Sequence, residues 1–171
     1  MKRTFREKGL SLLESLIALL IFSIGTLAFI AMYARSIVTA SDAQFRIEAS
    51  NYANELIQTV YSTVARDNGN AVIAADLKRF AFENAEGGEC KREEDGKLTW
   101  AGGDTAPLAI RDWICRIQLS PNALPGATKQ GAQKIVIQTD PTDFNRVVVT
   151  LRWTVPSEGV NHSHDVIAHI N

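Results

Sequence analysis

The sequence predicts an α+β fold, in which a long N-terminal α-helix packs on a small C-terminal antiparallel β-sheet. Three observations lead to this fold class. Residues 15–34 carry no formal charge, apolar residues then recur every three or four positions as far as residue 64, and apolar and polar residues alternate in the last third. With 171 residues, the chain has room for one sizeable core plus an appendage.

The uncharged run is a candidate membrane span. Twenty residues, from position 15 to position 34, cover about 30 Å as a helix, which is the thickness of one bilayer core. A secretory signal has a shorter apolar region followed by a small-residue cleavage site, so we expect this segment to be retained. Residues 1–9 carry a net charge of plus three, which should keep them in the cytoplasm and send the chain from residue 36 onward across the membrane.

The second half of the predicted helix is amphipathic. No proline occurs before Pro107, and the first strong stop is the polar run at residues 66–70, so one helix is expected from about residue 10 to 65. We divide the chain into a leader at 1–9, a membrane-spanning half-helix at 10–35, an amphipathic half-helix at 36–66 and a globular head at 67–171. The apolar positions of the amphipathic half are Phe45, Ala49, Tyr52, Leu56, Val60 and Val64.

The middle of the chain carries weaker patterns. Residues 71–84 are expected to form a short amphipathic helix, and residues 86–97 a charged, glycine-containing loop. A second short helix should begin near Pro107 and stop before Pro121. Residues 121–132 are then expected to form a linker.

The C-terminal third predicts three antiparallel strands, at 133–139, 146–155 and 162–170, joined by short turn-rich loops. In the middle strand, one face is apolar and the other is mixed. The apolar face should pack on the amphipathic half of the long helix, and its residues are Val147, Val149, Leu151 and Trp153.

No catalytic constellation is visible, and we expect no enzyme activity, cofactor or metal. His162 and His164 lie on one face of a strand beside Asp165, which is acceptable metal geometry, but two histidines without a third suitably spaced ligand are weak support. Gly126 and Gly131 have the spacing of a phosphate-binding loop, but Ala132 stands where lysine is required and a strand follows instead of a helix, so we reject that interpretation.

The two cysteines, Cys90 and Cys115, lie on the side of the membrane expected to be oxidising. An even cysteine count there favours a disulfide between them. The alternative is two buried free thiols, because Cys115 lies on an apolar helix face where a small hydrophobic residue would serve.

The N-terminal stretch KGLSLLE, residues 8–14, followed by a long apolar helix resembles the class III signal of type IV pilins. The resemblance implies that a prepilin peptidase cleaves between Gly9 and Leu10, and that Leu10, where most members have phenylalanine, becomes the N-methylated first residue. Within the family the likeness is to minor pilins of the PilV kind. The residues that carry it are the apolar segment, Asp112-Trp113, Leu124-Pro125-Gly126 and the strand pair around Trp153.

Glu14 matches the family's glutamate near the new N-terminus. An acidic side chain at the centre of a bilayer costs about 2.5 to 3.5 kcal/mol on insertion scales, and less near a helix end. Cleavage creates an α-amino cation, so Glu14 can pair with the N-terminus of its own or a neighbouring subunit. Assembly would then relieve an unpaired charge.

The resemblance implies a minor pilus subunit that helps to prime assembly at the inner membrane, where its head lies in the periplasm. After assembly, the subunit is expected to lie near the tip of the fibre. The implied partners are the peptidase, other minor pilins, major pilin, a tip-associated protein, an inner-membrane platform protein and membrane lipid. A minor pseudopilin of a type II secretion system is the first alternative. A membrane-anchored enzyme or metal-binding protein is less favoured. A DNA-uptake pilin is also less favoured, because residues 10–171 carry a net charge of minus four.

Overall fold

The computed structural model describes residues 8–84, 87–101, 107–139, 145–156 and 159–170, with side chains from Leu12 onward. Contacts divide the chain into two units, residues 1–41 and residues 42–171. The elements in chain order are α1 (Lys8–Thr63), α2 (Ala74–Lys78), β1 (Phe82–Glu83), β2 (Cys90–Arg92), β3 (Leu98–Trp100), α3 (Leu108–Leu119), β4 (Gln133–Gln138), β5 (Asn145–Thr154) and β6 (Asn161–Ile170).

Helix α1 confirms the predicted long helix. It runs without a break from Lys8 to Thr63, because no proline interrupts it and Gly25 is its weakest helix former among the side chains described. Its end is fixed by a turn in which the carboxylate of Asp67 accepts hydrogen bonds from the backbone N–H groups of Gly69 at 2.8 Å and Ala71 at 2.9 Å. Aspartate favours such local bonds over helix continuation, so the chain reverses here.

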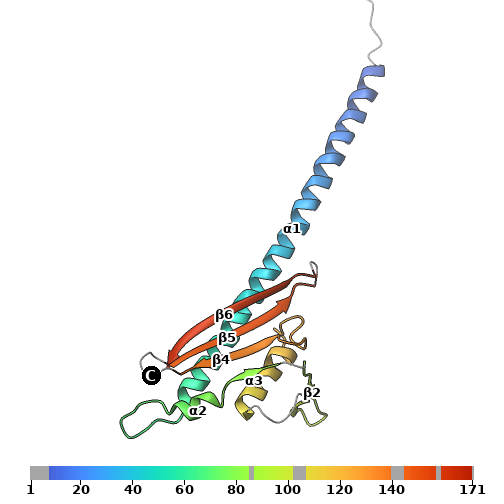
Figure 1. The fold of residues 1–171 in the computed structure, drawn as a ribbon. Coiled ribbons are helices and arrows are strands. Elements are labelled where there is room, and N and C mark those ends of the chain that lie inside the picture. The colour runs from blue at the N-terminus through green and yellow to red at the C-terminus, as the bar shows by residue number, and fades with distance from the viewer. Residues whose placement is uncertain (1–7, 85–86, 102–106, 140–144, 157–158, 171) are drawn as a thin grey trace, which may run out of the picture. The chain divides into compact units, whose positions relative to one another are not determined.

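The main sheet has the strand order β1-β4-β5-β6, and all its pairs are antiparallel (Figure 1). The register places Val149 of β5 opposite Ile135 of β4 and Val166 of β6. Because side chains alternate along a strand, β5 buries every second residue, and the strands predicted for the C-terminal third are confirmed.

The core lies between the apolar face of β5 and the part of α1 beyond Asp42 (Figure 1). The apolar positions predicted on the helix are in this core, with Phe45 at its margin, and Ala53 joins them. Trp113 of α3 closes another side, and its indole Nε1–H donates to the backbone oxygen of Tyr52 at 2.8 Å. The N–H group of this fully buried indole therefore has a hydrogen-bond partner, as buried tryptophans usually do.

The middle region differs from the prediction in two places. The expected helix at 71–84 shrinks to the five residues of α2, and Phe82–Glu83 become an edge strand against β4. The expected charged loop contains a hairpin, in which β2 pairs with β3. The reason is Gly96, whose φ of 83° permits the tight turn and whose N–H donates to the oxygen of Glu93 at 2.9 Å.

Helix α3 confirms the second predicted helix. Pro107 stands at its N-cap, where a missing N–H costs nothing, and the helix ends at Leu119, before Pro121. Residues 121–132 form turns with no helix or strand, as predicted for the linker, although they are held closely against the sheet.

Candidate functional site

The N-terminal unit presents an apolar helix surface without cover from other residues of that unit. From Leu12 to Tyr33 the large apolar side chains are exposed by between 51% and 72%. The helix is long and apolar enough to cross a membrane, by length and composition. So much contiguous apolar surface requires lipid or other helices around it.

Glu14 is the third residue of this helix whose side chain the structure describes. It borders a shallow apolar hollow on the helix surface together with Leu13, Ile17, Ala18 and Ile21. Among the side chains that the structure describes, Glu14 is exposed and forms no ion pair. Its carboxylate therefore stands beside an apolar surface and is available to a cation from outside the chain.

The predicted cleavage position falls at the start of the described backbone. Gly9 and Leu10 belong to the first turns of α1, and the side chain of Leu10 lies outside the described residues. Most of the leader, residues 1–7, also lies outside them.

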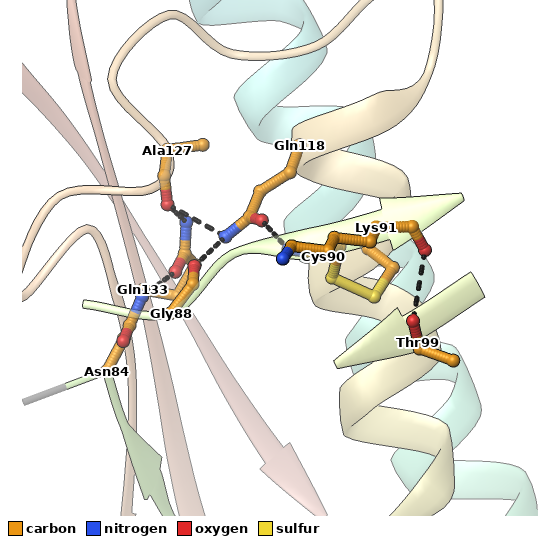
Figure 2. Close-up of a disulfide and its surroundings, with 9 residues drawn as sticks. Asn84, Gly88, Cys90, Lys91, Thr99, Gln118, Ala127 and Gln133 are labelled. Carbon is orange, nitrogen blue, oxygen red and sulfur yellow. Dashed lines mark hydrogen bonds between the residues drawn. A yellow bond between two sulfur atoms is a disulfide. The ribbon is translucent and has the colours of Figure 1, made fainter. Parts of the chain in front are cut away.

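The predicted disulfide is present in the head (Figure 2). Cys90 of β2 and Cys115 of α3 are joined across a separation of 25 residues, with their Cα atoms 5.2 Å apart, and both are buried. The bridge fastens a hairpin of only three residue pairs to the helix that packs on α1. A two-stranded hairpin of this size is not stable alone, so the covalent tie is a main part of its anchorage.

A buried amide network, which the sequence analysis missed, continues from the disulfide (Figure 2). The side-chain oxygen of Gln118 accepts from the N–H of Cys90 at 2.8 Å, and its amide donates to the oxygens of Gly88 at 2.8 Å and Ala127 at 3.3 Å. Gln133 also donates to Ala127, at 2.6 Å. Glutamines in a strand and a helix are typical of surface positions, so only the spatial arrangement reveals their role.

Gln133 extends this network to Asn84. The Asn84 side-chain amide donates to the side-chain oxygen of Gln133 at 2.9 Å, and both residues are almost fully buried. Each buried amide group is thus hydrogen-bonded, which is the condition under which burying it is tolerated. The network connects the segment after β1, the disulfide, α3 and the turn at Ala127.

The histidines of β6 do not form a metal site within the described residues. Nδ1 of His162 lies 3.3 Å from the carboxylate Oδ1 of Asp42 in α1. The imidazole ring stacks on Trp153, with 5.8 Å between the ring centroids. His164 shares its strand face, whereas Asp165 points to the other face. No group of three or more His, Cys, Asp or Glu side chains that could hold a metal occurs in the part of the chain described.

Comparison with known proteins bears on the N-terminus. Residues 4–30 match the family model described as the prokaryotic N-terminal methylation motif. Neither the curated proteins nor the solved structures gave a significant match to the chain. The matched segment, which includes most of the apolar run, and the antiparallel sheet packed on the part of α1 beyond Asp42 together support a type IV pilin-like protein with an α+β fold.

Proposed function

We propose that this chain is a minor type IV pilus subunit that helps to prime pilus assembly with other minor pilins. The observation that carries the proposal is the methylation motif at residues 4–30, placed at the start of one continuous helix that leads into a sheet-containing head. The motif is typical of subunits that are processed and then assembled into a fibre. We therefore propose that the chain acts through contacts with other subunits, and we assign it no catalytic role.

Processing would take place on the cytoplasmic side of the inner membrane. In this proposal the prepilin peptidase cleaves between Gly9 and Leu10, and Leu10 is N-methylated. The basic leader is removed, residues 10–35 remain in the membrane, residues 36–66 continue the helix and residues 67–171 form a periplasmic head. The matched motif supports these steps because it covers residues 4–9 of the leader, including the glycine, and most of the apolar run.

Assembly would use Glu14. The carboxylate lies on an apolar helix surface with no cation beside it among the described side chains. In a bundle of such helices, an N-terminal amine of a neighbouring subunit would supply that cation, and an unpaired charge in a low-dielectric setting costs several kcal/mol. The ion pair between Glu14 and that amine would therefore favour incorporation of the subunit into the fibre over its remaining in the bilayer.

The proposed priming role is supported by these features together with a head to which we assign no chemistry. The subunit would meet other minor pilins, a tip-associated protein and the platform protein in the inner membrane, after which major pilin is added beneath it. It would then end near the fibre tip and support motility or adhesion. A tip position requires that it be present in few copies per fibre.

The test is deletion of the gene followed by complementation with the wild-type chain. We expect few surface pili and weak twitching in the deletion strain, with recovery on complementation. A normal number of pili in the deletion strain, with retraction intact, contradicts the priming role.

A minor pseudopilin of a type II secretion system remains the alternative, because the same N-terminal motif serves both assemblies. The two functions differ in the phenotype of the deletion strain. Loss of a secreted enzyme from the medium with normal pili supports the pseudopilin, whereas loss of pili with normal secretion supports the pilus subunit.

A further inference from the structure

A small recess opens on the sheet face opposite the core, beside the turns at residues 126–132. Its volume is about 80 Å³, well above the roughly 10–15 Å³ that one water needs. The polar side chains that line it are Lys129 and Gln130 of the turns, Arg152 and Thr154 of β5, and Asn161 of β6. Segments distant in the sequence thus bring two cations to one small space.

Two glycines let the backbone approach these side chains. Gly126 and Gly131 have φ angles of 77° and 69°, which other residues rarely adopt. A Cβ atom on Gly126 would lie 2.9 Å from the hydroxyl of Thr154, and one on Gly131 would lie 3.1 Å from Nη1 of Arg152. The turns therefore depend on glycine at the two points where they close over the recess.

Hydrogen bonds hold both cations in place without using all their donors. Lys129 Nζ donates to Thr154 Oγ1 at 3.0 Å, and Arg152 Nη1 donates to the oxygen of Gly131 at 3.0 Å. Thr154 in turn donates to Asn161 Oδ1 at 2.8 Å. An ammonium has three N–H donors and a guanidinium five, so most donors of both groups remain available to a ligand.

No carboxylate among the described residues compensates this charge. Lys129 and Arg152 form no ion pair with any residue that the structure describes. Asp165 lies on the same sheet face, opposite Thr150, yet it forms no ion pair with Arg152. Two such cations in one recess stand out in a chain whose residues 10–171 carry a net charge of minus four.

The turns are supported from below by the buried amide network. Gln118 and Gln133 both donate to the oxygen of Ala127 (Figure 2), and the N–H of Gly131 donates to the oxygen of Asn84. Backbone held from within the core keeps its geometry when a ligand arrives, so little ordering cost remains for binding.

We propose that this recess is an oxyanion-binding site, which takes a carboxylate or phosphate group between Lys129 and Arg152. Both cations favour such groups, and a guanidinium also matches their geometry with paired N–H donors. The contacts come from side chains, so the site differs from a phosphate-binding loop ahead of a helix. It is independent of the proposed function, which rests on the N-terminal segment.

The test uses the full chain, ¹⁵N-labelled in detergent micelles, and titrates it separately with inorganic phosphate and with acetate, each replacing chloride at constant ionic strength and pH. We expect the amide signals of Gly131 and Thr154 to shift saturably with at least one of the two anions. Saturation with acetate alone identifies a carboxylate as the ligand group, and saturation with phosphate alone identifies a phosphate. Saturation with neither overturns the proposal.

Variants show whether the two cations are responsible. Lys129→Gln should weaken binding about tenfold or more, as expected for loss of a charge-assisted hydrogen bond. Lys97→Gln, which removes an exposed cation on the β2–β3 hairpin, is the matched control and should leave the affinity unchanged. Arg152→Gln is a second variant, which decides the question if the first perturbs the spectrum globally. Equal affinity in the wild type and the folded recess variant overturns the proposal.

Discussion

Reduction of the Cys90–Cys115 disulfide should lower the stability of the head by a calculable amount. The bridge closes a loop with a sequence separation of 25 residues. In the chain-entropy model, such a cross-link removes about 12 cal/mol/K from the unfolded chain, which corresponds to about 3.5 kcal/mol at 25 °C. That loss is a large share of the roughly 5 to 15 kcal/mol by which a domain is stable.

The assay is urea unfolding of the full chain in micelles, with and without reductant, followed by tryptophan fluorescence. Trp113 lies in α3, the helix that carries Cys115, and Trp100 of β3 lies opposite Cys90 in the β2–β3 hairpin. With a urea dependence of about 1 to 3 kcal/mol/M for a small domain, a loss of about 3.5 kcal/mol should lower the midpoint by about 1.2 to 3.5 M.

A variant with both Cys90→Ala and Cys115→Ala is the control, because reductant should not change its midpoint. If the wild-type midpoint is the same in both conditions, the bridge does not restrict the unfolded chain as calculated. The hairpin would then be held by the Gln118 hydrogen bond to Cys90 and by packing alone.

Three further predictions concern the N-terminus and the amide network. Glu14→Ala should leave membrane insertion and cleavage intact but reduce incorporation into pili, measured by immunoblots of sheared fibres against the membrane fraction; wild-type incorporation would make the glutamate incidental. Gly9→Val should leave the leader in place, which intact mass detects as a heavier chain, and a chain cut at the usual position would contradict the proposed cleavage. Gln133→Leu leaves Asn84 without its acceptor and should lower the free energy of unfolding, measured in urea, by about 2 kcal/mol. Gln138→Leu, at an exposed position of the same strand, is the control and should change that free energy by less than about 0.5 kcal/mol. Equal effects of the two variants would show that the network adds no stability.

Periodicity predicted the large elements correctly because each has one buried face. The helix positions from Ala49 to Val64 and the alternate residues of β5 are apolar because they meet in the same core. Burial of that kind leaves a regular trace in the sequence.

The middle of the chain was harder to predict because its structure depends on partners far away. Phe82–Glu83 form a strand only because β4 offers an open edge. The β2–β3 hairpin carries charged residues on a short segment, a composition typical of a loop, and it is held by a disulfide to α3. Local propensity gives way to such tertiary ties.

The two candidate sites also differ in how far the sequence predicts them. The processing motif is contiguous, so residues 8–14 and the apolar run after them are enough to indicate it. Lys129 and Arg152 are 23 positions apart and meet only because the turns fold back over β5. No spacing rule connects them, and the glycines that allow the approach resembled an unrelated motif.

The pairing of α1 with β5 has a consequence for the order of folding. Residues 49–64 of the helix find their core partners about a hundred positions later, at residues 147–155. Contacts that span so much chain form late, after the locally connected β4–β5–β6 meander. Until the last strand has emerged, Tyr52, Leu56 and Val60 have no sheet to cover them, so a newly translocated chain exposes an apolar helix face to other proteins. Chaperone binding during this interval is therefore expected to involve the helix, and truncations near the C-terminus should prolong it.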